Sequence, residues 1–197
     1  MAFANSIALE TTEKRSSRIH PQKYALWVAC ASMLMFFAAF TSAYIVRQSA
    51  GNWLEFVMPN LFFYSTIVIL LSSFTLHGAL VAFKKMKTQL FKVLLGISLV
   101  LGIAFLLLQY QAWTALTATG IELTTNPSSS FLFVISGFHA AHVLGGVVAI
   151  MVSFVMSLVK KHEVTPVRQL RLELTTQYWH FVDILWLYLF IFLIVQQ

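Results

Sequence analysis

Charge is scarce in this sequence. Only 10% of the 197 residues are Asp, Glu, Lys or Arg, whereas soluble domains carry about a quarter. Hydrophobic residues make up 59% and the mean hydropathy is +0.80, so too little polar surface remains to cover a globule in water. The scarcity of charge therefore excludes both a soluble globular domain and a disordered chain, and it indicates an integral membrane protein.

Cysteine and proline are also rare. Cys30 is the only cysteine and lies inside an apolar run, which excludes an intramolecular disulfide and a metal site built from several thiolates. Of the four prolines, Pro59, Pro127 and Pro166 fall between the apolar stretches. At those places a missing N–H interrupts no helix, so the apolar stretches can form continuous helices.

Five apolar stretches are each long enough to cross a bilayer, because about 20 helical residues span ~30 Å of hydrocarbon. They are residues 24–46, 61–83, 90–113, 131–159 and 172–195. The first 23 residues are polar and show no cleavable signal pattern. The sequence therefore predicts an all-α integral membrane bundle of five transmembrane helices, with residues 1–23 as a cytoplasmic tail and residues 24–197 as a single membrane domain.

The positions of the basic residues predict the orientation of these helices. Twelve of the 13 Lys and Arg residues lie in the N-terminal tail or around the connections after the second and fourth stretches, and only Arg47 lies on the other side. Basic segments face the cytoplasm, so we expect the N-terminus inside and the C-terminus outside. The net charge of +6 is thus a topology signal, and no nucleic-acid partner is expected.

Small residues recur every four positions along the fourth stretch. They are Gly137, Ala141, Gly145, Ala149, Ser153 and Ser157. Such spacing lets two helix backbones approach closely in a bilayer. We therefore predict a helix-packing ladder at these positions, with a substrate pathway along the small face as the alternative.

A few polar side chains stand at membrane depth in the fourth and fifth stretches. They are His139, His142, Glu173, His180 and Asp183, with Trp179 and Trp186 beside Asp183. A central Asp costs about 2.5–3.5 kcal/mol on insertion scales, so it needs a partner inside the protein. Helices that run in opposite directions bring His139 and Asp183 to similar depth. We predict an intramembrane polar cluster with a direct contact between these two side chains and the tryptophan N–H groups as further donors.

The role of the polar cluster stays open between structural packing, a proton relay and a metal or haem site. Glu173 lies near the start of its stretch, where the helix dipole and Arg168 or Arg171 are expected to stabilise its charge. His77 in the second stretch is expected to be a packed polar residue. The sequence contains no phosphate loop, nucleophile elbow or zinc motif, so no catalytic and no metal-binding residue is predicted.

Two long motifs occupy the last two stretches. Residues 136–146 read S-G-F-H-A-A-H-V-L-G-G, and Glu173 is followed by six residues, then His180-Phe-Val-Asp183 and Trp186. These motifs resemble G-F-H-G-x-H-V-x-x-G, and E-x6-H within Y-W-H-F-V-D-x-x-W, of subunit III of haem-copper terminal oxidases. Ala140 departs from the usual glycine. The resemblance covers the chain from about Tyr24 onward.

The resemblance implies a five-helix bacterial form of this family, which matches the last five helices of the seven-helix members. It implies a non-catalytic core subunit of an oxidoreductase that reduces oxygen to water and pumps protons. Haem and copper are expected in partner subunits, and this chain is expected to bind phospholipid and to support proton uptake. The expected partners are subunit I as the main contact, subunit II, a small subunit IV and membrane lipids, in the bacterial plasma membrane.

This sequence departs from the family at two further positions in the apolar stretches. Met33 and Ala112 stand where the family often carries buried acidic residues, so proton conduction by those carboxylates is not expected here. The electron donor stays open between cytochrome c and quinol. The alternatives are a small transporter or channel that uses the polar cluster, and an accessory subunit of a related nitric oxide reductase. Uninterrupted helices without an inverted repeat argue against the transporter.

Overall fold

The computed structural model describes residues 20–54, 58–159 and 165–196. Its helices are α2 (Pro21–Ser49), α3 (Leu61–Lys84), α4 (Thr88–Ala118), α5 (Pro127–Val159) and α6 (Pro166–Val195). All five are long and apolar enough to cross a membrane, which confirms the predicted all-α membrane fold. Most of the predicted tail, residues 1–19, lies outside the described ranges. The division into tail and membrane domain, and the orientation of the termini, stay predictions.

Each helix contains its predicted apolar stretch and extends beyond it at one or both ends, whereas α3 begins and α5 and α6 end at the predicted residue. Proline begins α2, α5 and α6, since a first helical turn leaves its N–H groups unpaired and loses nothing to proline. Thr165 caps α6 by accepting a hydrogen bond from the backbone N–H of Arg168 at 3.4 Å. Gly120 follows α4 with φ of 82°, the left-handed conformation that commonly ends a helix.

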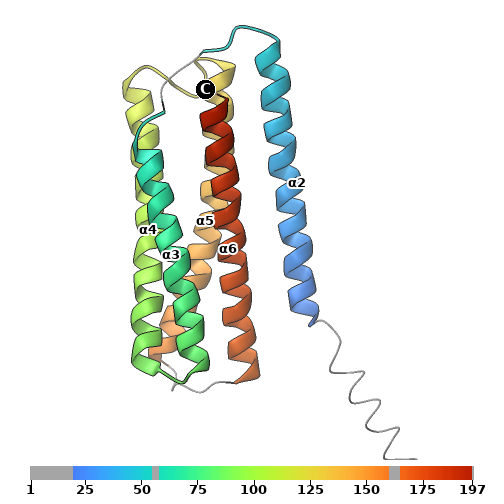
Figure 1. The fold of residues 1–197 in the computed structure, drawn as a ribbon. Helices are drawn as coiled ribbons and strands as arrows, with labels where there is room; N and C mark the ends of the chain where they lie inside the picture. The colour runs from blue at the N-terminus through green and yellow to red at the C-terminus, as the bar shows by residue number, and fades with distance from the viewer. Residues whose placement is uncertain (1–19, 55–57, 160–164, 197) are drawn as a thin grey trace, which may run out of the picture.

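Four of the helices form a packed group and α2 stands to one side (Figure 1). Within the described residues, α2 contacts α5 and α6 and no other helix. Three of its 29 residues are buried: Phe37, Thr41 and Tyr44. We call the end of the bundle that carries Lys23 and Lys84 the basic end; it is the lower end in Figure 1. The helix α2 is thus the least embedded of the five.

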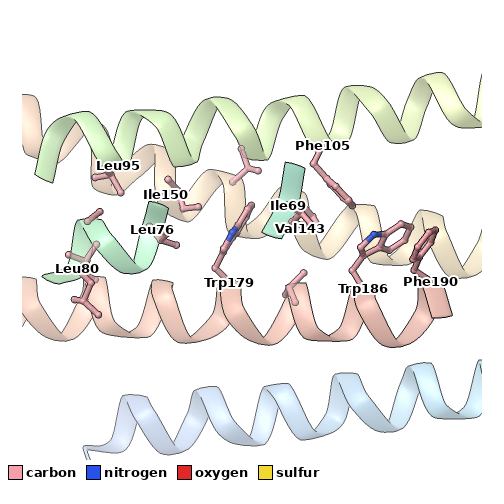
Figure 2. Close-up of a cluster of buried hydrophobic side chains, with 14 of the residues drawn as sticks. Ile69, Leu76, Leu80, Leu95, Phe105, Val143, Ile150, Trp179, Trp186 and Phe190 are labelled. Atoms are coloured by element: carbon pink, nitrogen blue, oxygen red, sulfur yellow. The ribbon is translucent and has the colours of Figure 1, made fainter. Parts of the chain in front are cut away.

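The core is organised around Trp179, which points from α6 toward α4 and α5 (Figure 2). Its side chain is fully buried, and it lies between two glycines. A Cβ atom on Gly146 of α5 would come within 2.7 Å of the indole, and one on Gly102 of α4 within 2.9 Å. Both distances are shorter than van der Waals contact, so only glycine fits at these two positions.

The small residues spaced four apart on α5 do not form the close contact between α5 and its neighbouring helices in this chain. A Cβ on Gly137 would meet no atom within 4 Å, and Ala141 and Gly145 are exposed. Toward the basic end, Ala149 and Ser153 are half-buried and Ser157 is buried. The ladder faces outward because α5 directs a different face, the one that carries Gly146, toward Trp179. The first half of the ladder therefore forms an outward surface.

The two kinds of glycine on α5 should respond oppositely to an added methyl group. Gly146→Ala places a Cβ against Trp179 and should destabilise the bundle by about 1–3 kcal/mol through overpacking. Gly137→Ala is the matched control, because its Cβ meets open space and alanine favours a helix by up to ~1 kcal/mol. Thermal unfolding in detergent measures both, and an equal melting temperature for the two variants would contradict the packing described.

Candidate functional site

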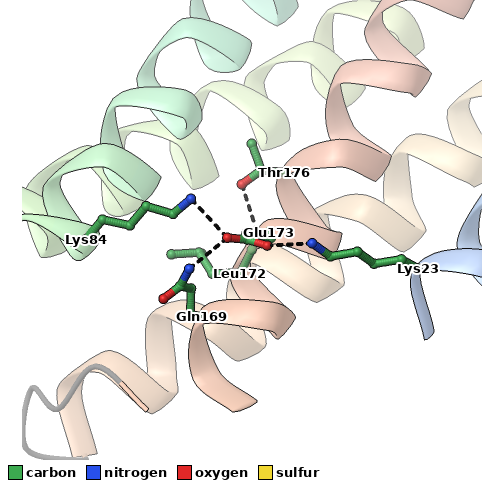
Figure 3. Close-up of polar contacts among 6 residues, drawn as sticks. All are labelled: Lys23, Lys84, Gln169, Leu172, Glu173 and Thr176. Atoms are coloured by element: carbon green, nitrogen blue, oxygen red, sulfur yellow. Dashed lines mark hydrogen bonds and ion pairs between the residues drawn. The ribbon is translucent and has the colours of Figure 1, made fainter. Parts of the chain in front are cut away.

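Glu173 joins three helices at the basic end (Figure 3). Its Oε2 pairs with Nζ of Lys23 on α2, and its Oε1 pairs with Nζ of Lys84 on α3, each at 2.9 Å. Gln169, one turn earlier on α6, donates its side-chain N–H to Oε1 at 2.9 Å. The Glu173 side chain is only 16% exposed. Because the carboxylate is shielded and has three donors, this contact stabilises the packing of α2 and α3 on α6.

The partners of Glu173 differ from those expected from the sequence. The prediction placed it in the first turn of its helix, beside Arg168 or Arg171. The helix α6 begins at Pro166, so Glu173 lies about two turns in, and the influence of the helix dipole fades beyond the first turn. Its ion pairs come instead from α2 and α3, which neighbour it in space and not in sequence.

Asp183 is buried near the middle of α6. It is 2% exposed, and neither carboxylate oxygen has a hydrogen-bond partner among the described residues. The hydroxyl of Ser73 on α3 lies near it without a hydrogen bond of normal geometry. The expected contact with His139 is not made, since both ring nitrogens of His139 also lack partners in the described part of the chain. A buried acid without a partner is costly.

His139 packs as a flat ring instead of serving as a hydrogen-bond partner. It is fully buried and stacks on Trp186, with ring centroids 4.8 Å apart and planes at 28°. Phe37 and Phe105 approach its edges at 6.3 and 6.1 Å. The indole N–H of Trp186 donates to Oγ1 of Thr66 at 2.9 Å. His139 thus contacts its neighbours through the face and edges of its ring, and neither ring nitrogen forms a hydrogen bond with the described residues.

His142 makes contacts of its own with α2 and α6, and its backbone carbonyl accepts a hydrogen bond from the hydroxyl of Tyr178 at 3.0 Å. Its side chain is half-exposed, and its Nδ1 hydrogen bonds to the backbone carbonyl of Phe138 at 2.7 Å. Its ring contacts Phe37 of α2 at 5.8 Å. The indole N–H of Trp179 has no partner within the described ranges, so it supplies no donor to Asp183. The residues predicted as one cluster therefore form several separate contacts.

His180 and His77 form a pair that sequence reasoning missed. Nδ1 of His180 shares a hydrogen bond with Oγ of Ser73, and its ring lies 5.6 Å from that of His77 on α3. His77 was expected to be packed, but its side chain is exposed. The four-residue spacing of Ser73 and His77 puts both on one face of α3, which is the signal that could have found them.

The polar residues of α6 connect this helix to three of its neighbours. In the three described ranges, no group of three or more His, Cys, Asp or Glu side chains is placed to hold a metal ion. The polar residues of α6 instead bind α2 and α3 through Glu173, α3 through His180, and α5 through the stack on Trp186. Polar contacts at three depths thus hold α6 to its neighbours.

The Glu173 contact predicts how firmly α2 is held. Cys30 is half-buried on α2, two turns from Lys23 on the same face, so its reaction with a maleimide reports opening of this helix. Glu173→Gln should raise the labelling rate about fivefold, the factor that corresponds to the ~1 kcal/mol of such an ion pair. Lys84→Met is the control, because it leaves the pair with Lys23 in place. Unchanged labelling in Glu173→Gln would show that the ion pair does not hold α2.

Comparison with known proteins places this architecture in a family. The chain matches the family described as Cytochrome c oxidase subunit III over residues 23–196. A probable cytochrome c oxidase subunit 3 of Nocardia farcinica is 30% identical over 175 residues, which cover 84% of this chain and 82% of the relative. The cytochrome c oxidase subunit 3 of Corynebacterium diphtheriae is 31% identical over 165 residues, covering 80% of each.

A second kind of oxidase is also represented among the relatives. A probable quinol oxidase subunit 3 of Staphylococcus saprophyticus is 25% identical over 188 residues, covering 91% of each chain. The similarity to each of these relatives spans most of both proteins, and the family match over residues 23–196 extends across the five helices. A multi-pass protein of the bacterial plasma membrane fits both the apolar helices and these relatives. The chain therefore belongs to the cytochrome c oxidase subunit III family of haem-copper oxidases.

Proposed function

We propose that this chain, a subunit III of a multisubunit haem-copper oxidase, is a non-catalytic core subunit of a proton-pumping complex. In this proposal it stabilises subunit I, binds phospholipid and supports proton uptake. Haem and copper are held by partner subunits, and subunit II and a small subunit IV complete the complex. The transporter and the nitric oxide reductase alternatives are not favoured, because the relatives are named as oxidase subunits.

The observation that carries the proposal is the outward half of the α5 ladder. Gly137 has open space beside it, and Ala141 and Gly145 are exposed. A surface hollow of 430 Å³ lies over Gly137 and Ala141, walled by Trp113, Phe133 and other apolar residues. Small residues at four-residue spacing allow close backbone approach in a bilayer. A helix of subunit I supplies the missing neighbour in this proposal.

A lipid site is supported by a cavity at the basic end. The cavity has a volume of 480 Å³ and is lined by side chains of all four packed helices. Apolar walls, including Val152 and Met156, are joined there by Arg168 and Arg171. Apolar walls suit an acyl chain and guanidinium groups suit a phosphate. The combination fits a phospholipid with its headgroup toward the basic end.

Support of proton uptake rests on ionisable side chains inside the membrane. His77, His180 and Asp183 lie along the contact between α3 and α6. Intramembrane histidines and carboxylates are the residue types that carry protons in other membrane proteins. We assign these residues a supporting role beside the redox subunits, which perform the reaction itself.

The proposed role predicts what should accompany the chain on purification. The tagged chain, isolated from membranes in mild detergent, should carry haem-bearing subunits, seen in a reduced-minus-oxidised spectrum and identified by mass spectrometry. Oxygen consumption with reduced cytochrome c, compared with quinol, then identifies the donor. A preparation free of haem-bearing partners would refute the proposal.

A bulky residue on the ladder should weaken the association with subunit I. Ala141→Phe fills the space that a partner helix needs, and it should lower the haem recovered per tagged chain by roughly threefold to tenfold, equivalent to about 0.7–1.4 kcal/mol. Val100→Phe is the control, because Val100 is 65% exposed on α4, away from the ladder. Equal recovery of haem with both variants would place subunit I elsewhere.

A further inference from the structure

An apolar groove lies on the surface between α4 and α5, in the half of the bundle next to the basic end. It has a volume of 610 Å³, and apolar side chains of both helices form its walls. Three of them, Val93, Val100 and Leu158, are each more than half exposed. Lys92 lies at one end of this groove, which we call the Lys92 groove, and is the charged residue among those that line it.

The length of the Lys92 groove matches one leaflet of a bilayer. Its lining on α4 extends from Lys92 to Leu101, a rise of ~14 Å at 1.5 Å per residue. One leaflet contributes ~15 Å, half of the ~30 Å hydrocarbon core. Lys92 lies only ~6 Å from the start of α4, and a lysine side chain is long enough to reach the headgroup level from there. An acyl chain from the leaflet at the basic end therefore fits the groove along its length.

The charge of Lys92 is not neutralised by the chain itself. Its side chain is half-buried, and within the described ranges it forms neither a hydrogen bond nor an ion pair. Glu173 is already paired with two other lysines, and Asp183 is buried. Exposed Lys85 and Lys87, just before α4, add charge of the same sign. A half-buried ammonium group without a counterion at the edge of the membrane favours an anionic ligand.

We propose that the Lys92 groove binds an anionic phospholipid, with one acyl chain between α4 and α5 and its phosphate at Nζ of Lys92. The inference rests on the part of the proposed function that assigns phospholipid binding to this chain, and it adds a second site and a headgroup charge. The groove shares no lining residue with the cavity at Arg171. A zwitterionic lipid is the poorer ligand, because the ammonium group of its headgroup is repelled by Lys92.

Photoreactive lipids test the site in the full-length chain. The chain is reconstituted into phosphatidylcholine vesicles with a trace of phosphatidylglycerol or phosphatidylcholine that carries a diazirine in its acyl chain, and adducts are mapped by mass spectrometry. Residues 92–101 should give about fivefold more adduct with phosphatidylglycerol, the preference expected from one basic side chain at the membrane surface. Residues 103–110, whose exposed side chains include Leu107 and Tyr110, should react equally with both lipids. Equal labelling of residues 92–101 would overturn the proposal.

Substitutions of Lys92 test whether its charge selects the lipid. Lys92→Gln should abolish the preference for phosphatidylglycerol, whereas Lys92→Arg should retain it. Lys87→Gln is the matched control, because it removes a nearby charge outside the groove, and it should keep most of the preference. A preference that survives in Lys92→Gln would contradict the assignment. Glycerophosphoglycerol, the same headgroup without acyl chains, should not compete; competition would show a site for the phosphate alone.

The purified oxidase, in the same vesicles, tests whether the groove is open to lipid in the complex. We expect the phosphatidylglycerol adduct at residues 92–101 there as well. An adduct that forms on the isolated chain and not in the complex would show that a protein covers the groove, and it would overturn the proposal. Adducts at residues 168–175 of the other cavity, without a preference at the groove, would refute this inference and leave the proposed phospholipid binding intact. The two failures are therefore distinguishable.

Discussion

The fit of Trp179 between two glycines is the constraint on which the packed helices depend. The indole fills the space where α4, α5 and α6 meet, and a single methyl group at Gly102 or Gly146 would collide with it. The rotation of α5 follows from this contact, because the helix must present Gly146 inward. With that side turned in, the ladder beginning at Gly137 is left facing outward. The packing of Trp179 thus determines which face of α5 is buried and which face is exposed.

The polar residues of this chain are arranged by depth along α6. Glu173 is held by lysines where long side chains can reach the interface, whereas His180 and Asp183 lie deeper, beside Ser73. His139 is buried among aromatic rings with no hydrogen bond in the described residues. Polar side chains at this depth are less unfavourable between helices than in contact with lipid, even when they lack a hydrogen-bond partner. This explains why they lie at helix contacts and not on the lipid side.

Much of the fold was predictable from sequence, because length and apolar composition determine which segments cross a bilayer. The motifs around His139 and Glu173 were enough to suggest the family. The contacts within the polar cluster were not predictable, since depth follows from residue number whereas the rotation of a helix depends on its packing. Lys23 and Lys84 could not be assigned to Glu173 for the same reason: they lie 150 and 89 residues away along the chain.

The position of α2 has a consequence for how the protein is made. This helix is synthesised before the others described, yet its contacts are with α5 and α6, the last two to emerge. Its contacts can therefore form only once α5 and α6 have entered the bilayer, and until then α2 has none of its described helix partners. During that interval Phe37 and Tyr44, which end up buried, face lipid. The α2 helix thus enters the membrane before the helices that bury these side chains.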